Sequence, residues 1–156
     1  MTESLLETVL VPIASEDDAE ATCRALLREI GDERPAVHVV HVIEKAGGAP
    51  DKAGVEQREE RAERIFEIAE ATLADEPVTV ETDVVYGTDV ADAIIRRAGE
   101  IDATAIAFTP RGASRWTKLL TGDVALNLVT RADRPVMVLP VEGDVDSNHD
   151  ARNDDT

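Results

Sequence analysis

The feature of this sequence that most constrains its fold is an alternation of short β-branched runs with longer segments of helical period. Ala36–Ile43 (AVHVVHVI) is apolar at most positions, which is typical of parallel strands that are buried on both faces. Val78–Val85 (VTVETDVV) alternates apolar and polar residues instead, as a half-buried strand does. Five strands are predicted on this basis: Thr8–Ile13, Ala36–Ile43, Val78–Val85, Asp102–Phe108 and Pro135–Leu139.

Between the strands, apolar residues recur three or four positions apart and predict amphipathic helices. The first helix is expected to start at Ser15–Asp18, which supply a cap and an acidic first turn, and to end at Gly31. The other three helices are expected over Val55–Leu73 after the loop Lys45–Gly54, after the turn Gly87–Asp89, and over Val124–Thr130.

The regular order of strands and helices predicts an α/β fold, namely an open five-stranded parallel sheet with helices on both faces (Rossmann-like). Sheets of this kind bind ligands beyond the carboxyl ends of their strands, at the point where the strand order reverses. We therefore expect any site at that edge. The residues at the predicted strand ends are Pro12–Ser15, Val42–Lys45, Tyr86–Thr88 and Thr109–Gly112.

The net charge limits the partners that the protein can have. The chain has 16 Lys and Arg residues against 33 Asp and Glu residues, a formal net charge of −17. Such a surface repels DNA phosphates and anionic lipids, so neither nucleic acid nor a membrane is an expected partner. Because the acids are spread over the whole chain, we favour a halophilic, haloarchaeal-like surface over an acidic patch for a basic partner.

Cysteine usage and the two ends of the sequence suggest a location and a domain boundary. The lone cysteine, Cys23, excludes an internal disulfide and fits a reducing compartment. The first residues lack the basic segment of a signal peptide, so a cytoplasmic location is expected. Residues 1–141 are expected to form one domain, and residues 142–156, which are polar, acidic and aperiodic, a disordered tail.

The stretch Thr109–Asp123 (TPRGASRWTKLLTGD) is the main candidate site. Gly112 and Gly122 would let backbone N–H groups approach an anion closely, and a helix that begins near Asp123 would direct its positive end to the same place. Glycines also serve ordinary strand-to-helix turns, so phosphate binding and a plain turn both remain open. The cations of this stretch are Arg111, Arg115 and Lys118.

Other polar groups are interpreted as structural. The acids Glu16–Asp18 are expected to favour a helix N-terminus rather than to bind Mg²⁺. His38 and His41 are three residues apart in a strand, so they should face opposite sides of the sheet and form no metal site. Cys23 is expected in the core, and Trp116 is interpreted as a packing residue rather than a platform for a base.

Residues 102–123 resemble the signature of universal stress protein domains, in which a strand is followed by Gly-x-x-Gly, nine residues and Gly-Ser/Thr. Here nine residues (ASRWTKLLT) separate Gly112 from Gly122. The segments VLVPI, VVHVIE, VVYGTDVADAII and ADRPVMVLP are similar to the family as well, so the resemblance covers nearly the whole domain. It implies the family's fold and a homodimer that pairs the last strands, Pro135–Val141, edge to edge. An apolar edge strand needs covering, which points the same way.

The resemblance also assigns nucleotide contacts to particular positions, as in family members that bind ATP. The backbone at the end of the second strand contacts adenine there, and Val42 matches it. Gly112 and Gly122 match two glycines of the motif. Three positions are altered: Ala14 replaces an aspartate that holds the adenosine end, Thr109 replaces the first glycine, and Asp123 replaces the closing Ser or Thr.

Asp123 is the alteration that most affects phosphate binding. A carboxylate about 4 Å from a phosphate charge costs roughly 4 kcal/mol per charge pair at an effective dielectric of 20, and about 1 kcal/mol in water. The helix dipole also stabilises the negative charge of Asp123 at the helix N-terminus, so this carboxylate can take the place of a bound phosphate. A bridging Mg²⁺ would reverse the effect. Thr109 adds a β-branched side chain that is expected to narrow the approach.

These observations lead to a universal stress protein-like hypothesis: a non-catalytic, stress-associated regulatory or ligand-binding module, degenerate in its nucleotide motif. No nucleophile–base pair and no pair of catalytic carboxylates can be assembled from the strand ends. The first alternative is an ATP-binding switch with at most slow hydrolysis, in which ATP and Mg²⁺ are held by Val42, Arg111, Gly112 and Gly122. The second is a dimerising interaction module without a ligand.

Overall fold

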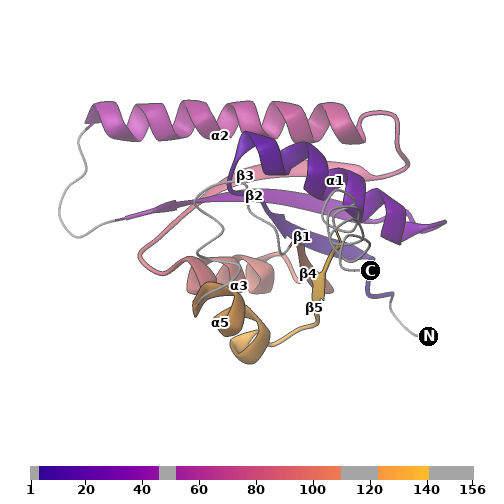
Figure 1. Ribbon diagram of the computed structural model, residues 1–156. Helices are drawn as coiled ribbons and strands as arrows, with labels where there is room; N and C mark the ends of the chain where they lie inside the picture. The colour runs from indigo at the N-terminus through magenta and orange to yellow at the C-terminus, as the bar shows by residue number, and fades with distance from the viewer. Residues whose placement is uncertain (1–3, 46–51, 110–122, 141–156) are drawn as a thin grey trace, which may run out of the picture.

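The strand ladder places all five strands in one parallel sheet, in the order β3-β2-β1-β4-β5. The computed structural model describes residues 4–45, 52–109 and 123–140, and only the backbone at residues 52, 53 and 123–125. Figure 1 shows the arrangement. The elements are β1 (Thr8–Pro12), α1 (Glu16–Ile30), β2 (Ala36–Glu44), α2 (Lys52–Leu73), β3 (Thr79–Gly87), α3 (Val90–Glu100), β4 (Ala105–Phe108), α5 (Asp123–Arg131) and β5 (Val136–Val138).

This architecture confirms the predicted fold class, and the differences from prediction are at element ends. The helix α2 begins at Lys52 and runs through Gly54, so part of the predicted glycine-rich loop is helical. The strand β4 begins three residues later than predicted because Asp102 has a φ of 53°, which a strand does not accommodate. The predicted tail, residues 142–156, lies outside the described residues.

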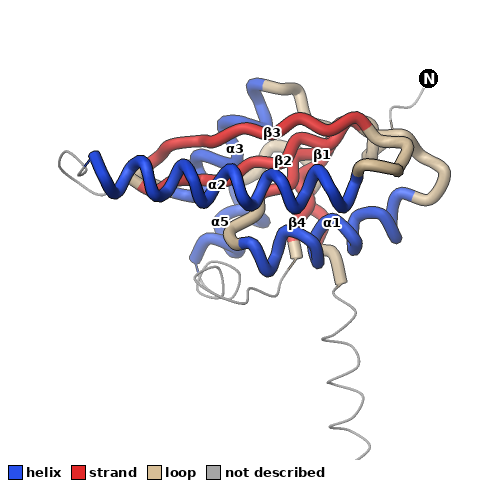
Figure 2. The backbone as a smooth tube through the Cα atoms, turned by 90° about the horizontal axis from the view of Figure 1, so that it is seen from above, coloured by secondary structure: helices blue, strands red, loops and turns tan. Residues whose placement is uncertain are grey.

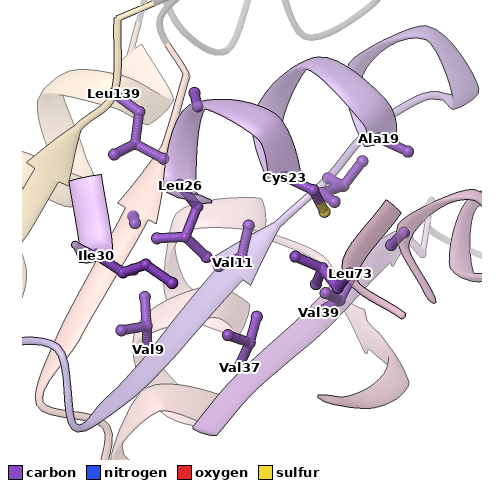
Figure 3. Close-up of a cluster of buried hydrophobic side chains, with 14 of the residues drawn as sticks. Val9, Val11, Ala19, Cys23, Leu26, Ile30, Val37, Val39, Leu73 and Leu139 are labelled. Atoms are coloured by element: carbon purple, nitrogen blue, oxygen red, sulfur yellow. The ribbon is translucent and has the colours of Figure 1, made fainter. Parts of the chain in front are cut away.

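Helices cover both faces of the sheet, which accounts for the strands that are apolar at consecutive positions (Figures 1 and 2). On one face, Val9 and Val11 of β1 pack with α1 and α2 in a cluster that includes Cys23 (Figure 3). On the other face, Leu10 of β1 packs with residues of α3 and α5, among them Ile94. Successive strand residues thus enter two different cores.

The lone cysteine belongs to the first of these cores, as predicted. Cys23 is fully buried among aliphatic side chains. Burial disfavours the charged thiolate and raises the pKa of the thiol to about 12. Cys23 therefore stays protonated at neutral pH and is a packing residue. None of the helices in the described segments is both long and apolar enough to cross a membrane.

The start of α1 confirms the predicted cap, and the start of α3 is capped in the same way. The Ser15 side chain accepts a hydrogen bond from the Asp18 N–H at 3.2 Å and caps α1. Asp89 caps α3 by accepting from the Asp92 N–H at 2.9 Å. The acids Glu16–Asp18 form the first turn of α1, where negative charge is favourable. The helix α1 ends at Gly31, whose φ of 54° suits glycine.

Arg134 connects the turn before β5 to the end of α3. Its Nη1 donates to the backbone oxygens of Ala98, at 3.0 Å, and Ala103, at 2.7 Å. The side chain is 17% exposed and also pairs with Asp133. The guanidinium thus satisfies carbonyl groups at the carboxyl end of α3, where a positive charge is favourable.

We expect Arg134→Met to lower the free energy of unfolding by about 2 kcal/mol, because hydrogen bonds that involve a charged group contribute about 1.5–3 kcal/mol. The control is Arg24→Met, which removes an exposed pair with Glu20 four residues away. Such a pair contributes about 0.3–0.5 kcal/mol. Urea unfolding of both variants measures the difference. Equal losses would show that Arg134 does not hold α3 to β5.

Candidate functional site

The strand order reverses between β1 and β4, so the expected site lies at their carboxyl ends. At this edge the sheet has a step. The strand β1 ends at Pro12, which pairs with Val40, whereas β2 continues four residues further to Glu44 beside β3. At about 3.3 Å per residue the offset is roughly 13 Å. Figure 1 shows the end of β2 reaching well past β1.

The step exposes the backbone of Val42. In a parallel strand, the N–H and C=O of a residue point to the same neighbouring strand, and the direction alternates along the chain. Val40 faces β1, because its carbonyl accepts from the Ile13 N–H at 2.9 Å. Val42 therefore faces the same side, but β1 has already ended there. Its side chain is buried in the core on the α3 face, and its backbone N–H and C=O have no partner strand on the β1 side.

Buried polar side chains collect at this same edge. In the part of the chain whose burial is described, the buried polar or charged residues are Ser15, Asp18, Thr22, His41 and Thr109. All come from the first half of α1 or from the residues at the carboxyl ends of β1, β2 and β4. Buried polar groups are costly unless they form hydrogen bonds. The edge is therefore held together by polar contacts, whereas the two cores are apolar.

Two of these contacts join segments that are far apart in the sequence. His41 Nδ1 lies 2.8 Å from the carbonyl oxygen of Ile13, which ties the end of β2 to the turn after β1. The hydroxyl groups of Thr22 and Thr109 lie 3.0 Å apart and tie the end of β4 to α1. Sequence reasoning missed both pairs. The available signal was a threonine beside the apolar stripe of α1 and a histidine in a strand that is apolar at most positions.

The structure gives a reason for the threonine at position 109 that the sequence alone does not show. Its side chain is buried and its hydroxyl is bound to α1. The hydrogen bond accounts for a polar, β-branched residue at this point. The narrowing of the ligand's approach stays a prediction.

The remaining residues assigned from the nucleotide motif are only partly described. The helix α5 begins at Asp123, close to the predicted start, so this residue supplies the first turn of the helix. Ala14 lies in the turn after β1, is buried against the α3-face core and carries no carboxylate. Arg111, Gly112 and Gly122 lie outside the described residues, as do Arg115, Trp116 and Lys118.

The projecting ends of β2 and β3 are fixed by side chains from two helices. Arg58 of α2 donates to the Glu44 carbonyl at 3.1 Å, and Arg96 of α3 donates to the Tyr86 carbonyl at 3.0 Å. The Tyr86 hydroxyl donates to the Glu59 carboxylate, and this hydrogen bond is the main reason that the pKa of Tyr86 is raised. These contacts fix the ends of β2 and β3, which border the step.

The two strand histidines face opposite sides of the sheet, as predicted. His38 borders a hollow on the α3 face and lies 4.0 Å from a Glu81 oxygen. His41 is on the opposite face by strand alternation, where it contacts the turn after β1. Across residues 4–45, 52–109 and 123–140, no group of three or more His, Cys, Asp or Glu side chains is arranged to hold a metal ion.

The hollow on the α3 face is distinct from the step. It has a volume of about 130 Å³ and lies beside the first half of β2 and β3. Its charged groups already pair with one another, as Arg97 does with Asp83 at 2.9 Å. We therefore place the candidate site at the step. The hollow is lined by Leu10, His38, Val39, Val40, Glu81, Thr82, Asp83, Arg97 and Ile101.

Comparisons with known proteins agree with the fold. The sequence profile of the universal stress protein family matches residues 6–140. A member of that family from Burkholderia pseudomallei has a similar structure, with a TM-score of 0.69 and 23% identity over 90% of this chain and 100% of the other. No functionally curated protein matched the chain.

Two further similar structures contain nucleotides. The universal stress protein from Archaeoglobus fulgidus in complex with dAMP has a TM-score of 0.61 and 22% identity, over 87% of this chain and 99% of the other. A family protein from Arabidopsis thaliana with AMP bound has a TM-score of 0.63 and 16% identity, over 88% of this chain and 94% of the other.

Proposed function

Because the chain belongs to the universal stress protein family, we propose that it is a non-catalytic regulatory module that binds an adenine nucleoside or nucleoside monophosphate. The ligand occupies the step at the carboxyl edge of the sheet, and ATP is disfavoured. The observation that carries the proposal is that α5 begins at Asp123, which puts a carboxylate-bearing residue where a phosphate would meet the helix N-terminus. The nucleotides of the two similar structures, dAMP and AMP, are monophosphates.

The base end of the proposed site is formed by backbone. Val42 turns one N–H donor and one C=O acceptor toward the step. Adenine presents the complementary pair on its Watson–Crick edge, with an acceptor ring nitrogen beside an amino donor. Guanine presents a ring N–H beside a carbonyl, which is the reverse. The step therefore suits adenine.

The phosphate end of the proposed site penalises charge. Each phosphate charge close to the Asp123 carboxylate costs about 1–4 kcal/mol, depending on solvent exposure. ATP brings roughly twice the charge of AMP, so its penalty is larger. The altered Ala14 lacks the carboxylate that holds the adenosine end in family members that bind ATP, which weakens AMP and ATP alike and leaves the charge of the phosphates to discriminate between them. ATP with a bridging Mg²⁺ is the alternative ligand, because the ion would join carboxylate and phosphate.

The absence of catalysis is part of the proposal and rests on how the polar groups of the edge are used. The Ser15 oxygen caps α1, and the Thr109 hydroxyl is paired with Thr22. His41 holds the carbonyl of Ile13. A catalytic nucleophile needs a base within hydrogen-bond reach, and these groups are instead engaged in holding the fold.

A homodimer through β5 is also proposed. The strand β5 is at the edge of the sheet, and Val138 is 53% exposed on it. Two neighbouring apolar side chains of α5, Leu126 and Val129, are 61% and 59% exposed. Exposed apolar edges promote strand pairing unless they are covered. Pairing two copies of β5 would cover them.

We further propose a cytoplasmic module with a surface adapted to high salt. A lone, buried cysteine suits a reducing compartment. Carboxylates are exposed on many elements, as on the outer side of α2 (Glu56, Glu59, Glu60, Glu63, Glu67 and Glu70). High salt would screen the mutual repulsion of such groups.

For the ligand, we expect calorimetric titration to show that wild-type protein binds AMP more tightly than ATP, with Mg²⁺ present. Asp123→Ser should strengthen ATP binding by about tenfold to several hundredfold, AMP binding less, and adenosine binding least, since each lost charge pair relieves about 1–4 kcal/mol. The control Asp75→Ser removes an exposed acid from the turn after α2. No gain for ATP in Asp123→Ser, or tighter binding of ATP than AMP by the wild type, would contradict the proposal.

For the dimer, the matched variants are Val138→Pro and Val138→Thr. The Leu139 N–H donates to the Phe108 carbonyl at 2.7 Å, so by alternation the N–H of Val138 faces the open edge. Proline removes that N–H without breaking the ladder with β4. Sedimentation should show a monomer for Val138→Pro and a dimer for Val138→Thr and wild type. A dimer in all three would place the interface elsewhere.

For the surface, we expect the unfolding temperature to rise by several degrees between 0.1 M and 1 M KCl. The Debye length falls from about 10 Å to 3 Å over this range, which screens a net charge of −17. The rise should level off above 1 M, and differential scanning calorimetry measures it. An unfolding temperature that is independent of KCl would argue against salt adaptation.

A further inference from the structure

The hydrogen bonds of Ile13 depart from the regular parallel pattern. Its N–H donates to the Val40 carbonyl at 2.9 Å, as the ladder requires. In a regular ladder, the Ile13 carbonyl would next accept from the Val42 N–H. It is instead the His41 side chain that approaches this oxygen, with Nδ1 at 2.8 Å. Among the described residues, no backbone hydrogen bond joins Val42 to Ile13.

The chemistry of the pair fixes the direction of this hydrogen bond. A carbonyl oxygen only accepts, so His41 Nδ1 carries the proton and donates. The imidazole is buried and reaches across the end of β1. His41 therefore takes one of the two acceptor positions of the Ile13 oxygen and fixes the direction of that carbonyl, which makes no hydrogen bond with the Val42 N–H.

We propose that His41 is a positioning residue for the adenine base: by holding the Ile13 carbonyl, it keeps the N–H of Val42 open to the ligand. This inference rests on the proposed nucleotide site. Without the imidazole, the β1–β2 ladder would extend by one bond and close the N–H that the base needs. His41 would not touch the ligand, and its effect would pass through the backbone of Val42.

The inference predicts a loss of base selectivity rather than a general loss of binding. The Val42 N–H donates to the ring nitrogen that is an acceptor in adenine and an N–H donor in hypoxanthine. Hypoxanthine also replaces the amino group beside that nitrogen by a carbonyl, so the ratio of AMP to IMP affinity reports how well the base pairs with the Val42 backbone, and closing the Val42 N–H lowers it. A residue with a purely structural role would weaken both nucleotides alike.

The test compares His41→Asn with His41→Gln. The Asn amide nitrogen can stand near the position of Nδ1 and donate to Ile13, whereas the longer Gln side chain displaces its amide from that position. Hydrogen exchange of the Val42 amide, measured by NMR on ligand-free protein, should be fast in wild type and His41→Asn and at least tenfold slower in His41→Gln. The AMP to IMP affinity ratio should fall at least fivefold in His41→Gln and be kept in His41→Asn.

The outcomes separate this inference from the proposed function. If wild type binds AMP but the two variants share the same Val42 exchange rate or the same AMP to IMP ratio, the role of His41 is refuted and the site stands. If wild type binds no adenine nucleotide, the proposed function and the role in base binding both fail. The exchange rates would then still show whether His41 keeps the Val42 N–H open. If His41→Gln does not fold, His41→Leu provides the same comparison.

Discussion

The burial of a parallel sheet on both faces is the constraint on which the rest of the structure depends. Each residue of β1 must pack against one of two helix layers, Val9 and Val11 on one side and Leu10 on the other. A polar side chain in such a strand would need a buried partner, which the apolar layers do not offer. Polar groups can be satisfied where the strands end and backbone carbonyls, caps and hydroxyls become available. The candidate site is at this edge for that reason.

The unequal lengths of the strands determine what kind of recognition this edge provides. The chain leaves β1 at Pro12 and enters α1 after the cap Ser15, whereas β2 and β3 continue together beyond that point. The step is therefore bordered by the end of β2, which pairs with β3 but has no partner strand on its other side. Arg58 and Arg96 bind backbone carbonyls at the ends of these two strands. Recognition by backbone does not depend on the side chain at the position. In the proposed complex, the base end would thus tolerate sequence change at Val42, whereas the phosphate end of the family motif depends on glycines and a hydroxyl.

Much of the fold followed from local signals in the sequence. Alternation of strands and helices, the caps Ser15 and Asp89, and the opposite faces of the two strand histidines all depend on residues within a few positions of each other. The exception is the start of α2, because glycine favours a loop whereas the helix includes Gly54, at a cost of about 1 kcal/mol that the rest of a long helix outweighs.

The contacts that shape the candidate site were not predictable in the same way. The Thr22–Thr109 and Ile13–His41 pairs join residues that are 87 and 28 positions apart. Neither partner carries a local signal of the other. The sequence suggested the edge and the backbone position Val42 as candidates, because these follow from topology and from the family resemblance. It did not reveal how the edge is fixed, because that depends on which side chains the folded sheet brings into register.

Two sources of negative charge oppose a phosphate in the proposed complex: the net charge of the surface and the carboxylate of Asp123. The distance over which each one acts decides which of them limits the number of phosphates on the ligand. The net charge of −17 acts over the whole surface and repels any anion. At 1 M salt the Debye length is about 3 Å, so this long-range repulsion is largely lost. Repulsion across about 4 Å loses less of its strength than repulsion from the many charges that are farther away, because screening increases with distance. At high salt, the proposed carboxylate at the start of α5 would therefore outweigh the rest of the chain's charge in determining how many phosphates the proposed ligand can carry.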